Sequence, residues 1–66
     1  MALTSQQETS ELLMIEEADA WFEYQEATRG QNEPRYAEVE PWAWRRLQRK
    51  LARIRQARAN LRAAPA

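Results

Sequence analysis

Apolar residues recur every three or four positions along two stretches of this chain, which is the spacing that places them on one face of an α-helix. The first stretch covers about residues 5–29 and contains neither glycine nor proline. The second covers about residues 41–63, and its only proline is its first residue. One glycine and three prolines among 66 residues are too few for a fold rich in tight turns. We therefore predict an all-α protein with helices over about residues 5–29 and 41–63.

The first predicted helix has start and stop signals and a wide apolar arc. Thr4 and Ser5 are favourable N-cap residues, and Gly30 suits the left-handed residue that follows many helices. The arc consists of a central row and of residues that widen it on both sides. The row is Met14, Ala18, Trp21 and Gln25, with Ile15 and Phe22 on one side and Leu13, Ala20 and Tyr24 on the other. A helix with so wide an arc is expected to contact more than one neighbour.

In the second predicted helix the apolar positions alternate three and four residues apart, as in a coiled coil or an antiparallel helix pair. This seam includes one polar residue, and it consists of Trp44, Leu47, Leu51, Ile54, Arg58 and Leu61. Asn32 and Pro34 disfavour helix, so residues 31–40 are predicted to be a connector, either a loop or one turn of helix, with Pro41 as the first residue of the second helix. Residues 64–66 are expected to be a frayed tail.

A connector of this length allows the second helix to return antiparallel to the first, which makes the chain a two-helix hairpin. We expect the seam to pack on the central row of the first helix. In residues, Leu47, Leu51, Ile54 and Leu61 are predicted to pack on Met14, Ala18, Trp21 and Phe22.

Charge is segregated along the chain. Ten acidic and two basic residues give residues 1–40 a formal charge of −8, and eight basic residues with no acidic one give residues 41–66 a charge of +8. The two halves are therefore predicted to be complementary surfaces that flank a shared apolar seam. Burial is expected to supply most of the energy, at about 1.5–3 kcal/mol per large side chain. Exposed ion pairs add about 0.2–1 kcal/mol each and mainly select the orientation.

The small size of the chain predicts that it needs further packing partners. Residues 1–66 can form one small domain, and chains this short bury only a modest share of their surface. Cysteine and histidine are absent, so neither a disulfide nor a thiolate or imidazole metal site can stabilise the fold. We expect a helical bundle, formed by self-association as a homo-oligomer or by docking on a larger protein.

Catalysis and cofactor binding are not indicated. An acidic strip of Glu16, Asp19, Glu23 and Glu26 shares one helix face, but carboxylate-bridged metal bundles also use histidine, so a solvated or ion-paired face is the favoured interpretation. No nucleophile–base pair or glycine-rich phosphate loop is found, and a non-enzymatic protein without a cofactor is expected. The longest apolar run, Leu12–Ile15, is far shorter than a membrane-spanning helix, and residues 1–10 do not resemble a secretory signal, so a cytoplasmic protein is expected.

Two sets of residues are candidates for binding. Tryptophan is frequent in binding hot spots, and Trp42 points away from the seam, where it either packs under the connector or anchors a partner. The candidate partner-binding residues are Trp21, Phe22, Trp42, Trp44, Leu47, Leu51 and Ile54. The candidate nucleic-acid-binding residues are Arg45, Arg46, Arg49 and Arg53.

These features favour a small protein–protein interaction or assembly module. The alternative is a nucleic-acid-binding protein that uses the arginine-rich second helix, and a further one is a small regulator that docks on a larger enzyme such as a polymerase. A helix that ends at Gly30, a short connector and a leucine-patterned helix with Leu47 and Leu51 are loosely similar to small phage head–tail joining proteins. Those proteins carry a β-hairpin between the helices, for which residues 31–40 are too short. The similarity identifies no family, and a phage structural subunit remains one example of an assembly module.

Overall fold

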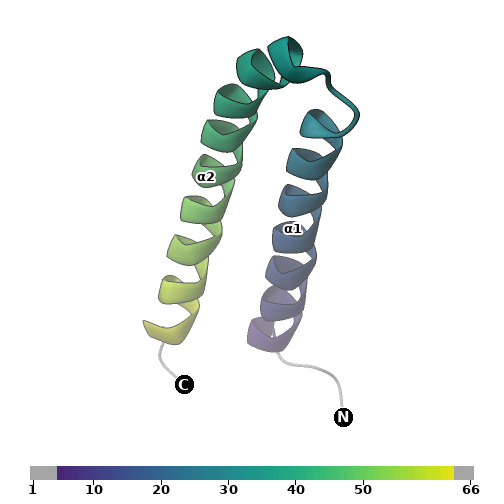
Figure 1. Ribbon diagram of the computed structural model, residues 1–66. Coiled ribbons are helices and arrows are strands. Elements are labelled where there is room, and N and C mark those ends of the chain that lie inside the picture. Colours follow the sequence, from purple (N-terminus) through teal and green to yellow (C-terminus); the bar gives the residue numbers. More distant parts are fainter. Residues whose placement is uncertain (1–4, 64–66) are drawn as a thin grey trace.

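The protein is a hairpin of two antiparallel α-helices (Figure 1). A computed structural model describes residues 5–63, in which α1 covers Ser5–Thr28 and α2 covers Glu33–Ala63. The predicted all-α hairpin is confirmed. The predicted N-cap Thr4 and the predicted tail over residues 64–66 lie outside the described residues.

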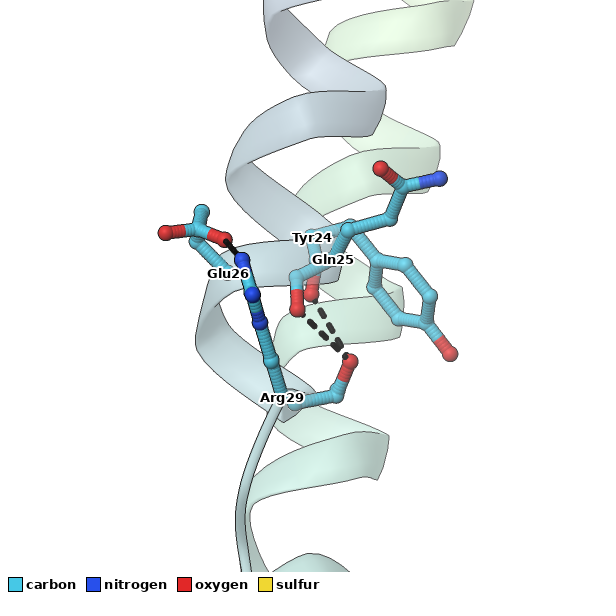
Figure 2. Close-up of polar contacts among 5 residues, drawn as sticks. Tyr24, Gln25, Glu26 and Arg29 are labelled. Atoms are coloured by element: carbon cyan, nitrogen blue, oxygen red, sulfur yellow. Dashed lines mark hydrogen bonds and ion pairs between the residues drawn. The ribbon is translucent and has the colours of Figure 1, made fainter.

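The C-terminus of α1 is closed by hydrogen bonds from the residues that end it. The Thr28 hydroxyl shares its hydrogen between the carbonyl oxygens of Tyr24 at 3.0 Å and of Gln25 at 3.3 Å (Figure 2). The Arg29 amide donates to the Gln25 carbonyl at 2.9 Å. Gly30 follows with a φ of 71°, the left-handed conformation predicted for it. The Gln25 carbonyl, one of the last four of α1, thereby receives a donor from beyond the helix.

The second helix begins eight residues earlier than predicted, at Glu33 instead of Pro41. Asn32 is its N-cap, because its side-chain Oδ1 accepts the Arg35 amide at 3.0 Å. Pro34 lies in the first turn, where no intrahelical partner for an amide hydrogen exists, so its ring does not disturb the helix. The predicted connector over residues 31–40 was therefore wrong in extent, because a proline near a helix start was interpreted as a helix breaker.

Pro41 lies inside α2 and not at its start. Proline has no amide hydrogen, so the carbonyl of Ala37 lacks its usual helical donor at this point. Figure 1 shows the first turns of α2 leaning over the end of α1 before the helix runs back beside it, and a bend of this kind is what an internal proline produces.

The hairpin is a single layer of two helices. Its Cα atoms extend over 52 × 22 × 8 Å, with a radius of gyration of 15.7 Å. A compact chain of this length would have a radius of about 11 Å. Within residues 5–63 each helix therefore has one neighbouring helix, and most of the circumference of both helices is not covered by the other.

The core lies between the helices and uses a different side of α1 from the predicted one. The buried apolar side chains are Leu13 and Ala20 from α1 and Ala43, Leu47, Leu51 and Ile54 from α2. Ala20 packs with Leu47 and Leu51, and the half-buried Tyr24 packs against this cluster. The predicted seam of α2 is therefore confirmed at Leu47, Leu51 and Ile54. The predicted packing of this seam on Met14, Ala18, Trp21 and Phe22 is wrong, because all four are exposed.

The size of the facing residues explains this choice. Ala20 lets the two helix backbones approach closely enough to bury Leu47, whose exposed fraction is 2%. Trp21 and Phe22 at the same place would hold the helices apart. The leucine seam is thus covered by the part of the apolar arc of α1 that carries Ala20, and the part that carries Trp21 and Phe22 is left outside.

Candidate interaction surfaces

Ion pairs join the acidic half of the chain to the basic half, as the charge segregation predicted. Glu23 accepts from Arg46 Nε and from Lys50 Nζ, each at 2.7 Å, and Glu17 accepts from Arg58 at 2.9 Å. Hydrogen bonding to Lys50, aided by the nearby Arg46 charge, lowers the pKa of Glu23. Arg58, the one polar residue of the predicted seam, is half-buried and is accommodated by its partner on α1.

Tyr24 links the two helices near the turn. Its hydroxyl donates to Glu40 Oε2 at 2.6 Å, and this hydrogen bond, together with burial, raises the pKa of Tyr24 to about 12. Its ring makes edge-to-face contacts with Trp21 at 6.3 Å and with Trp44 at 5.7 Å between centroids. Tyr24 lies opposite the Glu26–Arg29 ion pair, which is on the solvent side of α1 (Figure 2). The position of α2 relative to α1 is therefore fixed by polar as well as apolar contacts.

Apolar side chains occupy two sides of α1, and only one of these sides meets α2. Residues two positions apart lie about 200° apart around a helix, so Ile15 is nearly opposite Leu13 and Phe22 nearly opposite Ala20. We call the uncovered side the outer face of α1, and it consists of Met14, Ile15, Ala18, Trp21 and Phe22. Apart from Trp21, which also touches the ring of Tyr24, these residues point away from the contacts with α2.

The outer face exposes more apolar surface than isolated surface residues do. The exposed fractions of its four large side chains run from 40% for Trp21 to 63% for Met14 and Phe22. With about 200 Å² for each large side chain, these fractions leave roughly 450 Å² of apolar surface on one helix. Patches of about 300–600 Å² are the largest that monomeric proteins usually show, and they are often functional.

A second surface, on α2, is cationic. Arg45, Arg49 and Arg53 follow at intervals of four residues, so they form one row along the helix, and all three are exposed. None of them has an ion pair within the described residues 5–63. Beside the row, Arg46 lies over the ring of Trp42 with its Cζ 5.4 Å from the ring centroid. An open groove of about 280 Å³ runs along this side and is lined by Trp42, Arg46, Arg49, Lys50 and Arg53.

The sequence-predicted binding residues thus divide into two groups. Leu47, Leu51 and Ile54 are buried inside the hairpin, and Leu47 and Leu51 pack with Ala20 of α1. The four aromatic candidates, Trp21, Phe22, Trp42 and Trp44, are all at least 40% exposed. Trp44 was assigned to the predicted seam, but it is exposed and lies beside Tyr24 at the edge of the helix pair.

Three residues of the outer face were not proposed for binding from the sequence. Met14, Ile15 and Ala18 were present in the predicted apolar arc, but Met14 and Ala18 were assigned to the internal packing and Ile15 was given no role. The signal that could have identified them is the width of the arc, because one neighbouring helix cannot cover it.

No group of side chains suited to a metal ion occurs among the described residues. Within the acidic strip, Glu23 is engaged by two cations of α2 and Glu26 by Arg29. Neither of the two helices as described is long and apolar enough to cross a membrane.

Comparison with known proteins assigns the chain to no family: no family model matches it, and neither a curated protein nor a solved structure does.

Proposed function

We propose that this protein is a small self-assembling module that associates through the outer face of α1. The observation that supports the proposal is the patch of Met14, Ile15, Trp21 and Phe22 on a helix that already buries Leu13 on its other side. A helix with apolar residues on both sides is typical of one that is covered on both sides.

The energetic argument also favours association. Two such patches facing each other would remove roughly 900 Å² of apolar surface from water, which approaches the roughly 1,000 Å² expected of a specific interface before its polar rim is counted. A two-helix layer has little interior of its own, and association through the outer face would give α1 a packed helix on both of its apolar sides.

Light scattering and sedimentation at increasing protein concentration test this proposal. We expect a mass of two or more chains, which the double variant Met14→Gln and Phe22→Gln reduces to that of a monomer while helicity by circular dichroism is retained. The matched control is Leu12→Gln, because Leu12 is 59% exposed but lies outside the outer face. A monomeric wild-type protein at all concentrations, or equal effects of control and double variant, would refute the proposal.

A second candidate function is binding of nucleic acid by α2. It is supported by the row of unpaired arginines next to Trp42, since phosphate groups are bound by exposed cations and bases stack on aromatic rings. The row lies on α2, so it would stay accessible when the outer face of α1 is covered. A role as a regulator docked on a larger enzyme has no specific observation in its favour.

Fluorescence anisotropy with a labelled single-stranded oligonucleotide at low salt tests this second candidate. We expect binding that weakens as salt rises and that the double variant Arg49→Gln and Arg53→Gln reduces. The control is Arg62→Gln, which removes another exposed arginine of α2 that does not line the groove. No change in anisotropy at low salt would exclude this function.

A further inference from the structure

The outer face has an internal symmetry that specifies how a second copy would dock. Its large side chains lie three and four residues before Ala18, at Ile15 and Met14, and three and four residues after it, at Trp21 and Phe22. A symmetric dimer places one surface against its own copy, so residue i contacts residue j and residue j contacts residue i. A row that reads the same in both directions about its centre meets this requirement when the two helices are antiparallel.

We infer that two hairpins pair through antiparallel α1 helices, with a two-fold axis at Ala18. This inference rests on the proposed self-assembly and names both the partner, a second copy of the chain, and its orientation. Met14 then lies opposite Phe22 of the partner subunit, and Ile15 lies opposite Trp21 of the partner subunit. Ala18 meets its own copy, and its small side chain lets the two helices approach closely there.

The polar residues at the two ends of the face favour the same arrangement. Seven residues before Ala18 stands Glu11, and seven residues after it stands Gln25, both exposed. In the antiparallel pair Glu11 lies opposite Gln25 of the partner subunit, which can donate a hydrogen bond to the carboxylate. A parallel pair would place Glu11 against Glu11 of the partner subunit. Like charges that face each other are unfavourable, so the antiparallel orientation is preferred.

The third possible arrangement, with α1 packed on α2 of the second copy, is disfavoured by the apolar side of α1 and by the arginines of α2. If α1 packed on α2 of the second copy, the side of α1 farthest from its own α2 would stay uncovered, and this is the side that carries Ile15 and Phe22. In the α1–α1 pair the two α2 helices lie at the outer edges of the assembly. Their unpaired arginines, Arg45, Arg49 and Arg53, then remain apart and in water.

Disulfide cross-linking of the full chain tests the arrangement, and the absence of native cysteine makes the result simple to interpret. The two variants are Glu11→Cys and Gln25→Cys, one of them labelled with ¹⁵N so that mixed and identical pairs differ in mass. In the antiparallel pair, the two copies of position 11 are about 21 Å apart along the helix, at 1.5 Å per residue, so neither variant should cross-link with itself. A mixture of the two should form the mixed disulfide. Ala18→Cys, at the axis, is the positive control and should cross-link alone.

Each outcome decides between arrangements once light scattering has established the mass. A mixed disulfide without identical pairs supports the antiparallel register. Three results would overturn this register and leave self-assembly standing. They are a disulfide between two copies of Glu11→Cys, a mixture of the two variants that fails to cross-link, and a dimer in which Ala18→Cys does not cross-link. A monomer would overturn both the register and the proposed function.

Discussion

Truncation of Leu47 tests whether the side of α1 that we find buried is the one that holds the hairpin together. Leu47 is 2% exposed and packs with Ala20 and Leu51. The variant Leu47→Ala removes three buried carbon atoms at about 0.8 kcal/mol each and leaves a cavity, and such changes cost about 2–5 kcal/mol in protein cores. Because the hairpin is one layer thick, its neighbours can collapse into part of the space. We therefore expect a loss of about 2–3 kcal/mol.

Urea unfolding followed by circular dichroism measures this loss. With a slope near 1 kcal/mol per molar urea, as for small proteins, the midpoint should fall by about 2–3 M. The matched control is Leu12→Ala, the same chemical change at a residue that is 59% exposed, for which we expect a change within about 0.5 kcal/mol. Both proteins are compared at one concentration, because self-association would add to the apparent stability.

The result that would refute the reasoning is a similar loss in both variants, or a larger one for Leu12→Ala. Either would mean that α1 turns a different side to α2. A large loss for Leu47→Ala alone would support the packing of the leucine seam on the side of α1 that carries Ala20.

Three further predictions concern polar contacts and the turn. Glu23→Gln should lower the urea midpoint slightly at neutral pH, and high salt should shrink this difference, since the ion pairs are partly exposed. The pKa of Glu23 is lowered in the fold, so its contribution is present above its ordinary pKa of 4.5 and is lost as the pH falls through the folded pKa. The pKa of Tyr24 is about 12, above its ordinary 10.0, so its contribution to stability is complete below pH 10.0 and is lost as the pH rises through about 12. Phenolate absorbance should show that Glu40→Gln lowers this pKa, and an unchanged titration would contradict the hydrogen bond. Gly30→Ala should cost about 1 kcal/mol in urea unfolding because φ there is 71° with open space around it, and no loss would argue against the left-handed conformation.

The candidate surfaces follow from the sequence only in part. Spacing identifies the arginine row of Arg45, Arg49 and Arg53, because their positions four residues apart define one side of any helix that contains them. Spacing also places Trp21 and Phe22 together on α1. It does not tell whether that side meets α2 or faces outward, so from the sequence Trp21 and Phe22 were candidates both for internal packing and for partner binding.

The sequence by itself determined the features that depend on one helix at a time or on the net charge of each helix. The three-and-four spacing of Leu47, Leu51 and Ile54 selects the buried side of α2, Gly30 ends α1, and the segregated charges pair one helix with the other. Proline is ambiguous at this level, since Pro34 and Pro41 are each compatible with the start of a helix, and only the N-cap contact of Asn32 shows which one lies in the first turn.

The tertiary structure decided how α1 is rotated about its own axis. Both sides of this helix are apolar, so the sequence pattern permits either side to face α2. The choice depends on how closely the backbones can approach and on which polar groups then meet: Ala20 admits Leu47, and the same rotation brings Glu23 to Lys50. These fits involve two helices at once, and the side with Phe22 is left outside because its bulk cannot enter the narrow space between them.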